Sequence, residues 1–408
     1  MLRVQTSVSI YQVTQIVGQP SRNKTLSFNF VNELTCSDSW RDFTNDAKIV
    51  VPKNLYIKDK NNKTISINGS NQNIGGFSDS TPLLMRGDKV TIDWGYKYFK
   101  NGVEIFEGTY DSKNNTHLFQ GFISEVTSKK PIEFKCEDNF WKLKQAPAPI
   151  HTFGASDSLE TIINFMLANY NIGKYPDDQF TFNPITTTTF GEFRIGNETI
   201  AEVLGRLRKD YHFESYFVGN ELRCGVSVYN EATAKTHTFT FQKDIISDEL
   251  DYRRKEDMKV SIAASNKIEQ ETGAITKDGH AKTKCQRLEV LVTLRNGSDT
   301  PDYYIKQKGM DYPPNIGGER STLTYPGAKS ISDLESLALA ELVKYYYTGF
   351  KGHFTTFGMP YVQVGDNVKL IDPVLPERNG LYKVRAVDYS CTVTGGLRQK
   401  IQIDYLIV

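Results

Sequence analysis

The residues that most often carry out catalysis or bind metals are scattered along this chain. Its 408 residues include six histidines, and none of them has a metal-binding spacing such as HExxH. They are His117, His151, His212, His237, His280 and His353. The sequence contains no GxSxG nucleophile elbow and no cysteine with a nucleophile signature. We therefore predict no catalytic, cofactor-binding or metal-binding residue, and no enzymatic activity.

The sequence contains pairs of adjacent carboxylates that could act as acid–base pairs. Three of them are Glu137 with Asp138, Asp177 with Asp178, and Asp248 with Glu249. Glycoside hydrolysis needs two carboxyl groups roughly 5–9.5 Å apart across a cleft, one of them with a raised pKa. Adjacent residues of a strand point to opposite faces of the sheet, which is the wrong arrangement. We predict that these pairs lie on solvated edges or turns.

Two Gly-Asp dipeptides, Gly87-Asp88 and Gly365-Asp366, resemble ligand-binding loops. A structural interpretation is favoured, because glycine supplies an unusual φ and aspartate bonds the local backbone where a turn enters a strand. The Gly-Gly dipeptide at 317–318 lacks the strand and helix that flank a phosphate loop, so we interpret it as a connector.

The five cysteines are single and odd in number, which argues against both a disulfide framework and a zinc site. We predict reduced, mostly buried thiols at Cys36, Cys136, Cys224, Cys285 and Cys391. Lysine plus arginine number 49 against 48 acidic residues, a formal net charge of +1. This balance gives no electrostatic reason for nucleic-acid or membrane-surface binding. No signal peptide and no apolar run of about 18 residues is found, so we expect folding in a cytoplasm and no membrane insertion.

The elements that would position these residues begin with strands over 1–148. Apolar residues alternate there with polar ones, which is typical of strands with one buried face. The alternating sets are Leu26, Phe28 and Phe30, then Val90, Ile92, Trp94 and Tyr96, then Ile132, Phe134 and Cys136. The segment 68–80 is rich in Asn, Gly and Ser and predicts a loop. The prolines at 146–150 indicate a boundary.

A small α/β domain is predicted over 149–232, because the apolar period changes to that of helices. One helix carries Leu159, Ile162, Ile163, Met166, Leu167 and Tyr170, and a second carries Ile200, Val203, Leu204, Leu207 and Tyr211. Asp157 with Glu160 is the expected cap of the first helix, and Asn197 that of the second. Gly219-Asn220 predicts a hairpin turn between two strands.

Strands return over 233–408, interrupted by a helical element near 332–348. Ser332 with Glu335 resembles a capping box, and Gly349 lies where a helix stop is expected. The predicted buried stripe of the helix is Leu334, Leu337, Ala338 and Leu342. The final strand alternates Ile401, Ile403, Tyr405 and Ile407 with polar residues.

A faint internal duplication links the two strand-rich regions. Residues 87–92 (GDKVTI) resemble residues 365–370 (GDNVKL), and each segment precedes two further strands in the same order. A trimer of such chains would present six similar modules, because each chain carries two. Trimers with closed point-group symmetry are ordinary assemblies.

Over most of its length the sequence resembles the tail hub proteins of phages, of the late-control-D type, which are related to the hub module of contractile injection systems. The resemblance lies in five phrases in family order. These are SWRDFTNDAKIVVPKNL at 39–55, MRGDKVTIDWGY followed by LFQGFISEVTSKKPIEFKCEDNFWKLKQ, IAEVLGRLRKDYHFESYFVGNELRCG, GFKGHFTTFGMPYVQVGDNVKL, and GLYKVRAVDYSCTVTGGLRQKIQIDY. Some relatives continue into a lysozyme domain or a spike, whereas this sequence ends at Val408.

The resemblance implies an α+β, mainly β fold. It has two tube-like β-barrel domains (1–148 and 233–408), the α/β middle domain (149–232), and the helix before the C-terminal strands. It implies a virion structural protein of the tail or baseplate, assembled in the bacterial host cytoplasm. The homotrimer would be a ring of pseudo-six-fold symmetry that joins the hexameric tail tube to a tip or spike protein. Its bore would pass the tape-measure protein and then DNA, without stable nucleic-acid binding.

Two alternatives stay open at this point. The 22 tyrosines and 12% aromatic content could indicate a carbohydrate-binding adhesion module, and relatives with a lysozyme extension raise a wall-degrading enzyme. Trp40, Trp94 and Trp141 are interpreted as barrel core. Uncovered strand edges invite association, so the polar faces of the strands at 89–96, 119–126 and 399–407 are the candidate ring surfaces.

Overall fold

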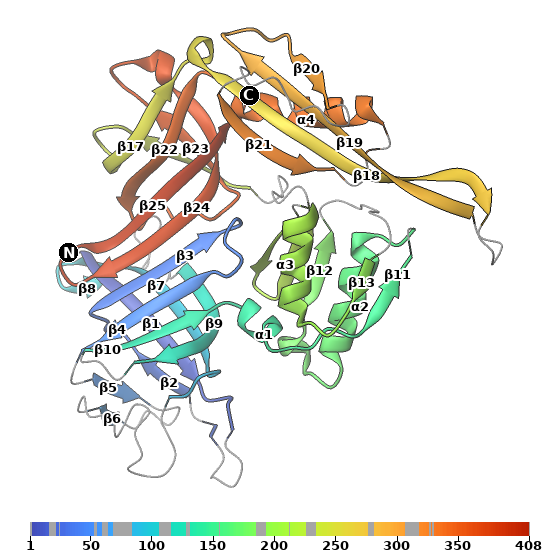
Figure 1. Ribbon diagram of the computed structural model, residues 1–408. Helices are drawn as coiled ribbons and strands as arrows, with labels where there is room; N and C mark the ends of the chain where they lie inside the picture. The colour runs from blue at the N-terminus through green and yellow to red at the C-terminus, as the bar shows by residue number, and fades with distance from the viewer. Residues whose placement is uncertain are drawn as a thin grey trace.

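The computed structural model describes the chain except for short gaps (Figure 1). The gaps are residues 1, 16–21, 24, 53–54, 59–63, 68–83, 106–115, 128–130, 155, 185–192, 212, 226–233, 276–280, 307–317, 326–327, 329 and 408. The predicted loop at 68–80 therefore lies outside the described residues. The fold is mainly β, as the sequence predicts, and it has four α-helices among the described residues, three of which correspond to the predicted helices. No helix in the described ranges is both long and apolar enough to cross a membrane.

The first β module is built from strands of the amino-terminal third. Its strands are β1 (Leu2–Tyr11), β2 (Thr25–Phe28), β3 (Glu33–Ser39), β4 (Asp46–Val51), β5 (Leu55–Lys58), β6 (Thr64–Ile67), β7 (Lys89–Lys100), β8 (Val103–Glu104), β9 (Thr116–Val126) and β10 (Ile132–Glu137). The predicted stripes of β7 and β10 are buried as expected. Phe30 is an exception, because β2 ends at Phe28 and the Phe30 side chain is 54% exposed.

The middle unit follows and has its own buried core. Its elements are α1 (Phe140–Leu143), β11 (His151–Phe153), α2 (Leu159–Asn171), η2 (Pro176–Asp178), β12 (Thr181–Pro184), β13 (Phe193–Ile195), α3 (Ile200–Tyr211), β14 (Glu214–Val218) and β15 (Glu221–Gly225). The turn at Gly219-Asn220 joins β14 to β15, as predicted. Both predicted caps are wrong: Ser158 accepts from the Thr161 amide, and Thr199 caps α3.

The second β module closes the chain. It consists of β16 (Thr236–Thr240), β17 (Ile245–Arg253), β22 (Gly349–Phe357), β23 (Asn367–Ile371), η5 (Pro376–Arg378), β24 (Gly380–Thr392) and β25 (Gly396–Leu406). Ile401 and Ile403 are buried as predicted, but Asp404 is buried too and β25 ends before Ile407.

Between β17 and β22 the chain forms an inserted unit. It comprises η4 (Lys255–Asp257), β18 (Lys259–Ile275), β19 (Ala281–Arg295), β20 (Asp302–Ile305), β21 (Glu319–Thr324) and α4 (Ile331–Tyr345). The four strands make a separate sheet, and α4 packs on one face of it. Ser330 and Asp333 form the capping box of α4, in place of the predicted Ser332 and Glu335. Leu337 is 41% exposed and so leaves the predicted buried stripe.

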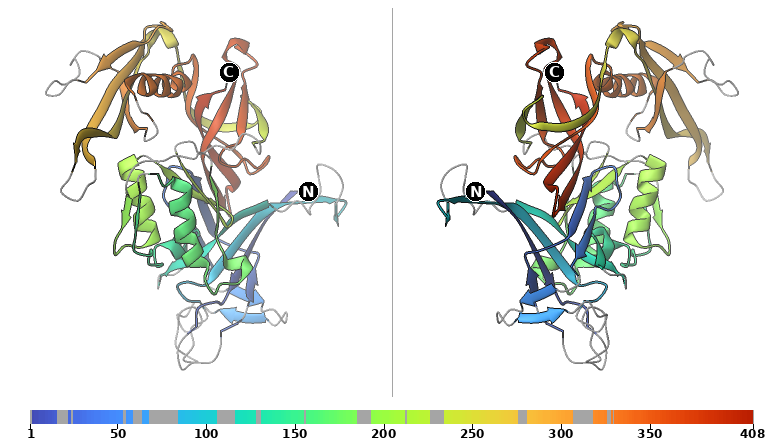
Figure 2. Two further views of the ribbon diagram at one scale, coloured as in Figure 1. Left: turned by 90° about the vertical axis from the view of Figure 1, so that its right-hand side faces the viewer. Right: turned by 90° about the vertical axis from the view of Figure 1, so that its left-hand side faces the viewer.

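The two β modules share one sheet and one core. Among the described strands the order is β17-β22-β25-β24-β3-β4-β10-β9-β7-β1-β2-β5-β6, with β23 pairing β24 and β16 pairing β23. This sixteen-stranded sheet is not closed into one barrel. The two modules lie end to end, the middle unit lies beside the first module, and the inserted unit lies beside the second (Figures 1 and 2). The distal end of β7 and the amino terminus project from the body in Figure 2.

Candidate assembly interface

Asp88, the aspartate of the first Gly-Asp corner, is fully buried. The backbone amides of Val13 and Thr14 donate to its Oδ1, each at 3.2 Å, and the amide of Met85 donates to Oδ2 at 2.8 Å. The guanidinium of Arg22 binds both oxygens, with Nη1–Oδ1 at 2.9 Å and Nη2–Oδ2 at 2.6 Å. One carboxylate thus ties the chain that leaves β1 to the chain that enters β7.

Asp366, the aspartate of the second corner, has a matching set of partners. The amide of Gln363 donates to Oδ2 at 3.0 Å and the amide of Lys235 donates to Oδ1 at 2.9 Å. The Nε2 of His237 lies 3.0 Å from Oδ2. Burial acts to raise the pKa of Asp366, but the hydrogen bonds from His237 and the two amides outweigh it and hold the pKa below its ordinary value. The group is therefore a carboxylate at neutral pH.

The backbone of the two corners also matches. Gly87 and Gly365 have φ values of 93° and 87°, in the region that favours glycine. Gly87 N donates to Ile123 O at 2.7 Å, and Ile123 N donates back to the carbonyl of the corner aspartate at 2.9 Å. At the second corner Gly365 N donates to Val384 O at 3.0 Å, and Val384 N donates to Asp366 O at 2.9 Å. This confirms the structural interpretation of both dipeptides and makes Ile123 equivalent to Val384.

A β-bulge follows each corner at the same position. In β9 the register towards β10 skips Ser124, the residue after Ile123. In β24 the register towards β25 skips Arg385, the residue after Val384. β24 has one further shift, before Val384, that β9 lacks. Because bulges are specific features of a strand pair, a shared bulge beside a shared corner is strong evidence of internal duplication.

Strand order gives the same result over the whole of each module. The first module has the spatial order β1-β7-β9-β10-β4-β3, and the second has β16-β23-β24-β25-β22-β17. Matching strands also follow one another in the same order along the chain. One difference separates them: β1 runs antiparallel to β7, whereas β16 runs parallel to β23. The two modules are therefore alike in five strands and reversed in the sixth.

The joint between the modules is a strand pairing. β3 of the first module pairs antiparallel with β24 of the second through seven residue pairs, from Ala386↔Ser39 to Thr392↔Glu33. Next to this strand pairing, the rings of Trp94 and Tyr389 pack edge to face with their centroids 5.4 Å apart. The ring of Tyr361 stacks on Tyr389 at the same centroid distance. These aromatic side chains belong to the core that both modules share. The modules therefore meet as neighbouring parts of a continuous sheet.

The predicted ring surfaces are not sheet edges. The strands at 89–96, 119–126 and 399–407 correspond to β7, β9 and β25, and each pairs with a strand on both sides, except that Glu125 and Val126 at the end of β9 pair only with β10 among the described strands. Gln399 is fully buried and its side-chain amide donates to Phe357 O at 2.9 Å. An open sheet edge is found instead on β17. Among the described residues, β17 pairs only with β22, so its second edge is open.

The three carboxylate pairs lie in different surroundings. Asp177 and Asp178 lie in η2, on an exposed turn, and Asp248 and Glu249 lie in the open edge strand, as predicted. Asp138 is a correction, because it is 7% exposed and its oxygens accept the amides of Asn45 and Phe140 at 3.2 and 2.9 Å. Burial raises the pKa of Asp138 to about 7. Its position at the start of α1 explains the burial, which a pair pattern does not reveal.

The three remaining histidines among the described residues contact neighbouring side chains. His117 contacts Asp93, His151 packs on Phe165, and His353 lies 3.4 Å from Glu249. His212 and His280 lie outside the described residues. Within the described ranges no three His, Cys, Asp or Glu residues are grouped so as to hold a metal ion.

The four cysteines whose side chains are described, Cys36, Cys136, Cys224 and Cys391, are free and buried, as predicted. The side chain of Cys285 lies outside the described residues, as does Gly317. Trp94 is core, whereas Trp40 packs on Tyr216 and Trp141 stacks on Phe122, near the middle unit.

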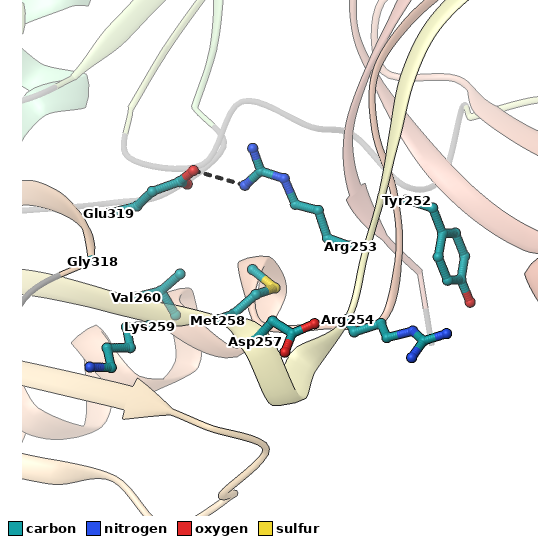
Figure 3. Close-up of a pocket in the computed structure, with 9 residues that line it drawn as sticks. All are labelled: Tyr252, Arg253, Arg254, Asp257, Met258, Lys259, Val260, Gly318 and Glu319. Carbon is teal, nitrogen blue, oxygen red and sulfur yellow. Dashed lines mark hydrogen bonds and ion pairs between the residues drawn. The ribbon is translucent and has the colours of Figure 1, made fainter.

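Cavities occur where the units meet. One of about 620 Å³ lies at the root of the inserted unit, between the end of β17 and the start of β18. Figure 3 shows Arg253 reaching across it to Glu319, 2.8 Å away, while Tyr252 points to the opposite side of the strand. Another of about 610 Å³ is bordered by Trp40, Arg208 and Asp404. Sequence reasoning missed these sites, because they join segments far apart along the chain.

Comparison with known proteins identifies the fold. No family model matches the chain, and no curated protein matches its sequence. Among solved structures, a tail protein from Neisseria meningitidis has a TM-score of 0.52 at 11% identity, covering 98% of this chain and 96% of its own. The 43-kDa tail protein of prophage MuSo2 from Shewanella oneidensis has a TM-score of 0.51 at 10% identity, covering 99% and 98%. The chain therefore has the fold of phage tail proteins over almost its entire length.

Proposed function

We propose that this protein is a structural hub of a phage-type tail, located in the virion tail after assembly in the host cytoplasm. It forms a homotrimer whose ring presents six similar β modules, and it joins the hexameric tail tube to a tip or spike protein. The bore of the ring passes the tape-measure protein and then DNA. The protein acts by geometry, without enzymatic activity and without stable binding of nucleic acid.

The observation that carries this proposal is the internal duplication. Two modules with the same strand order, the same aspartate corner and the same bulge are joined in one sheet through the pairing of β3 with β24. Three such chains can match a six-fold partner on one face and a three-fold partner on the other. In this hub the first β domain spans residues 1–148, the α/β domain spans 149–232, and the second β domain spans 233–408. The core of the middle unit also takes in Phe140 and Leu143, just before its proposed start.

The mass of the purified protein in solution tests the proposal. Light scattering should give three times the 46.3-kDa mass of one chain. Negative-stain images should show a ring with a central hole. An obligate interface of this kind typically buries more than about 2,000 Å², so the trimer should persist on dilution to nanomolar concentration. A monomer at every concentration would contradict the hub function.

A further inference from the structure

The open edge of β17 has a counterpart within the same chain. The registers of β22 make β17 equivalent to β3: His353 pairs with Glu249 and Gln402, just as Lys48 pairs with Thr35 and Lys135. Counting along the strands, Ser37, Asp38 and Ser39 correspond to Asp251, Tyr252 and Arg253. The edge that β3 uses to pair with β24 is therefore the edge that β17 leaves open.

The part of β24 that pairs with β3 also has a counterpart in the first module, at the end of β9. Because Ile123 is equivalent to Val384 and the bulges coincide, Glu125 and Val126 correspond to Ala386 and Val387. In β24 these residues face β3 at the module joint. In β9 they pair with β10 on one side, and none of the described strands pairs with them on the other. The open edge of β17 thus corresponds to the β3 side of the joint, and the open edge at the end of β9 corresponds to its β24 side.

Transferring the register of the joint places residues of compatible chemistry opposite each other. The pairs Ala386↔Ser39 and Val387↔Asp38 become Glu125↔Arg253 and Val126↔Tyr252. The first is a pair of opposite charges, and the second joins a β-branched residue to an aromatic one. Both kinds of cross-strand pair stabilise sheets. The half-buried Val126 and Tyr252 already border the shared core.

We propose that β17 of one subunit pairs antiparallel with the end of β9 of a second copy, with Arg253 opposite Glu125 and Tyr252 opposite Val126. This inference rests on the proposed trimer and specifies its seam. Three such intermolecular joints, alternating with the three intramolecular joints of β3 and β24, close the sheet into a ring. Arg253 then exchanges its exposed contact with Glu319, and Glu125 its exposed contact with Lys135. Such surface pairs are weak enough to be exchanged.

Cysteine cross-linking tests the seam in the full-length protein. Residues directly opposite each other in antiparallel strands have Cβ atoms about 4.5–5.5 Å apart, close enough for a disulfide after a small adjustment. The double variant Glu125→Cys/Arg253→Cys should yield a covalent trimer on non-reducing gels after mild oxidation. Neither single variant should do so. The matched control Glu125→Cys/Arg295→Cys uses an exposed arginine of the inserted unit and should stay uncross-linked.

Charge reversal gives a second measurement that needs no disulfide. Glu125→Arg and Arg253→Glu should each weaken the trimer by about threefold or more per seam, the effect of one exposed ion pair. The double reversal should restore the affinity. A trimer that shows neither cross-linking nor recovery would overturn the seam and leave the hub function intact. A wild-type protein that never trimerises would overturn both, and the light-scattering mass tells these outcomes apart.

Discussion

Replacing Asp88 by alanine should be among the most damaging single substitutions in the first β module. The Arg22 and Asp88 side chains are only 2% and 0% exposed, so the substitution leaves a guanidinium buried without its counter-ion. Breaking a buried pair from one side costs about 3–5 kcal/mol. The amides of Val13, Thr14 and Met85 lose their acceptor as well. Each unsatisfied donor adds about 1 kcal/mol or more, although such terms are not additive.

The second corner supplies the matched control for this experiment. Asp366→Ala removes the acceptor of two amides and of His237, but these partners include no guanidinium like that of Arg22 at the first corner. We expect a loss of about 1–3 kcal/mol there, against about 5 kcal/mol for Asp88→Ala. Urea unfolding gives the stabilities, and hydrogen exchange of β1 and β7 localises the effect. Equal losses at the two corners, or a loss below about 1.5 kcal/mol for Asp88→Ala, would refute this reasoning.

Two further predictions concern the middle and inserted units. The pKa of Asp138 is raised to about 7 by burial, so the folded protein holds this proton more tightly than the unfolded chain does. The resulting stability is complete below about pH 4 and is lost as the pH rises through 7, so urea unfolding should show a decline of about 2–4 kcal/mol from pH 4 to pH 8. Asp138→Asn should reduce the pH dependence of the free energy of unfolding. If that dependence is unchanged in the variant, a group other than Asp138 causes it. In α4, Leu334→Ala removes a fully buried side chain and should cost about 2–5 kcal/mol, whereas Leu337→Ala, at a 41% exposed position, should cost less than about 1 kcal/mol in thermal unfolding. Similar losses at the two leucines would contradict the packing of α4.

Local patterns in the sequence predicted the strands and the corners because both are set by neighbouring residues. The alternation of Val90, Ile92 and Trp94 fixes which face of β7 is buried. The Gly-Asp pairs predict a positive φ and a carboxylate that bonds nearby amides, and both are found. The helix caps were missed by one or two residues, since several Ser, Thr, Asp and Asn side chains near each start can accept the same amides.

What the sequence could not predict depends on contacts between distant segments. The separate sheet of the inserted unit interrupts the second module between β17 and β22, so strands that are neighbours along the chain belong to different sheets. The buried carboxylate of Asp138 accepts a hydrogen bond from the amide of Asn45, ninety-three positions earlier. The reversal of β16 relative to β1 leaves no trace in composition or period, because an alternating pattern reads the same in both chain directions.

The two kinds of joint in the proposed ring cannot be equally strong. After its bulge β24 continues to Thr392 and pairs with β3 through seven residue pairs, whereas β9 ends at Val126. The joint within a chain is therefore longer than the joint between chains, and the Trp94–Tyr389 contact reinforces only the former. Six similar modules then form a ring whose joints alternate long and short, so its symmetry is three-fold even where its outline is six-fold. It follows that dissociation should separate subunits at β17 and leave each pair of modules joined, because every long joint lies within one chain.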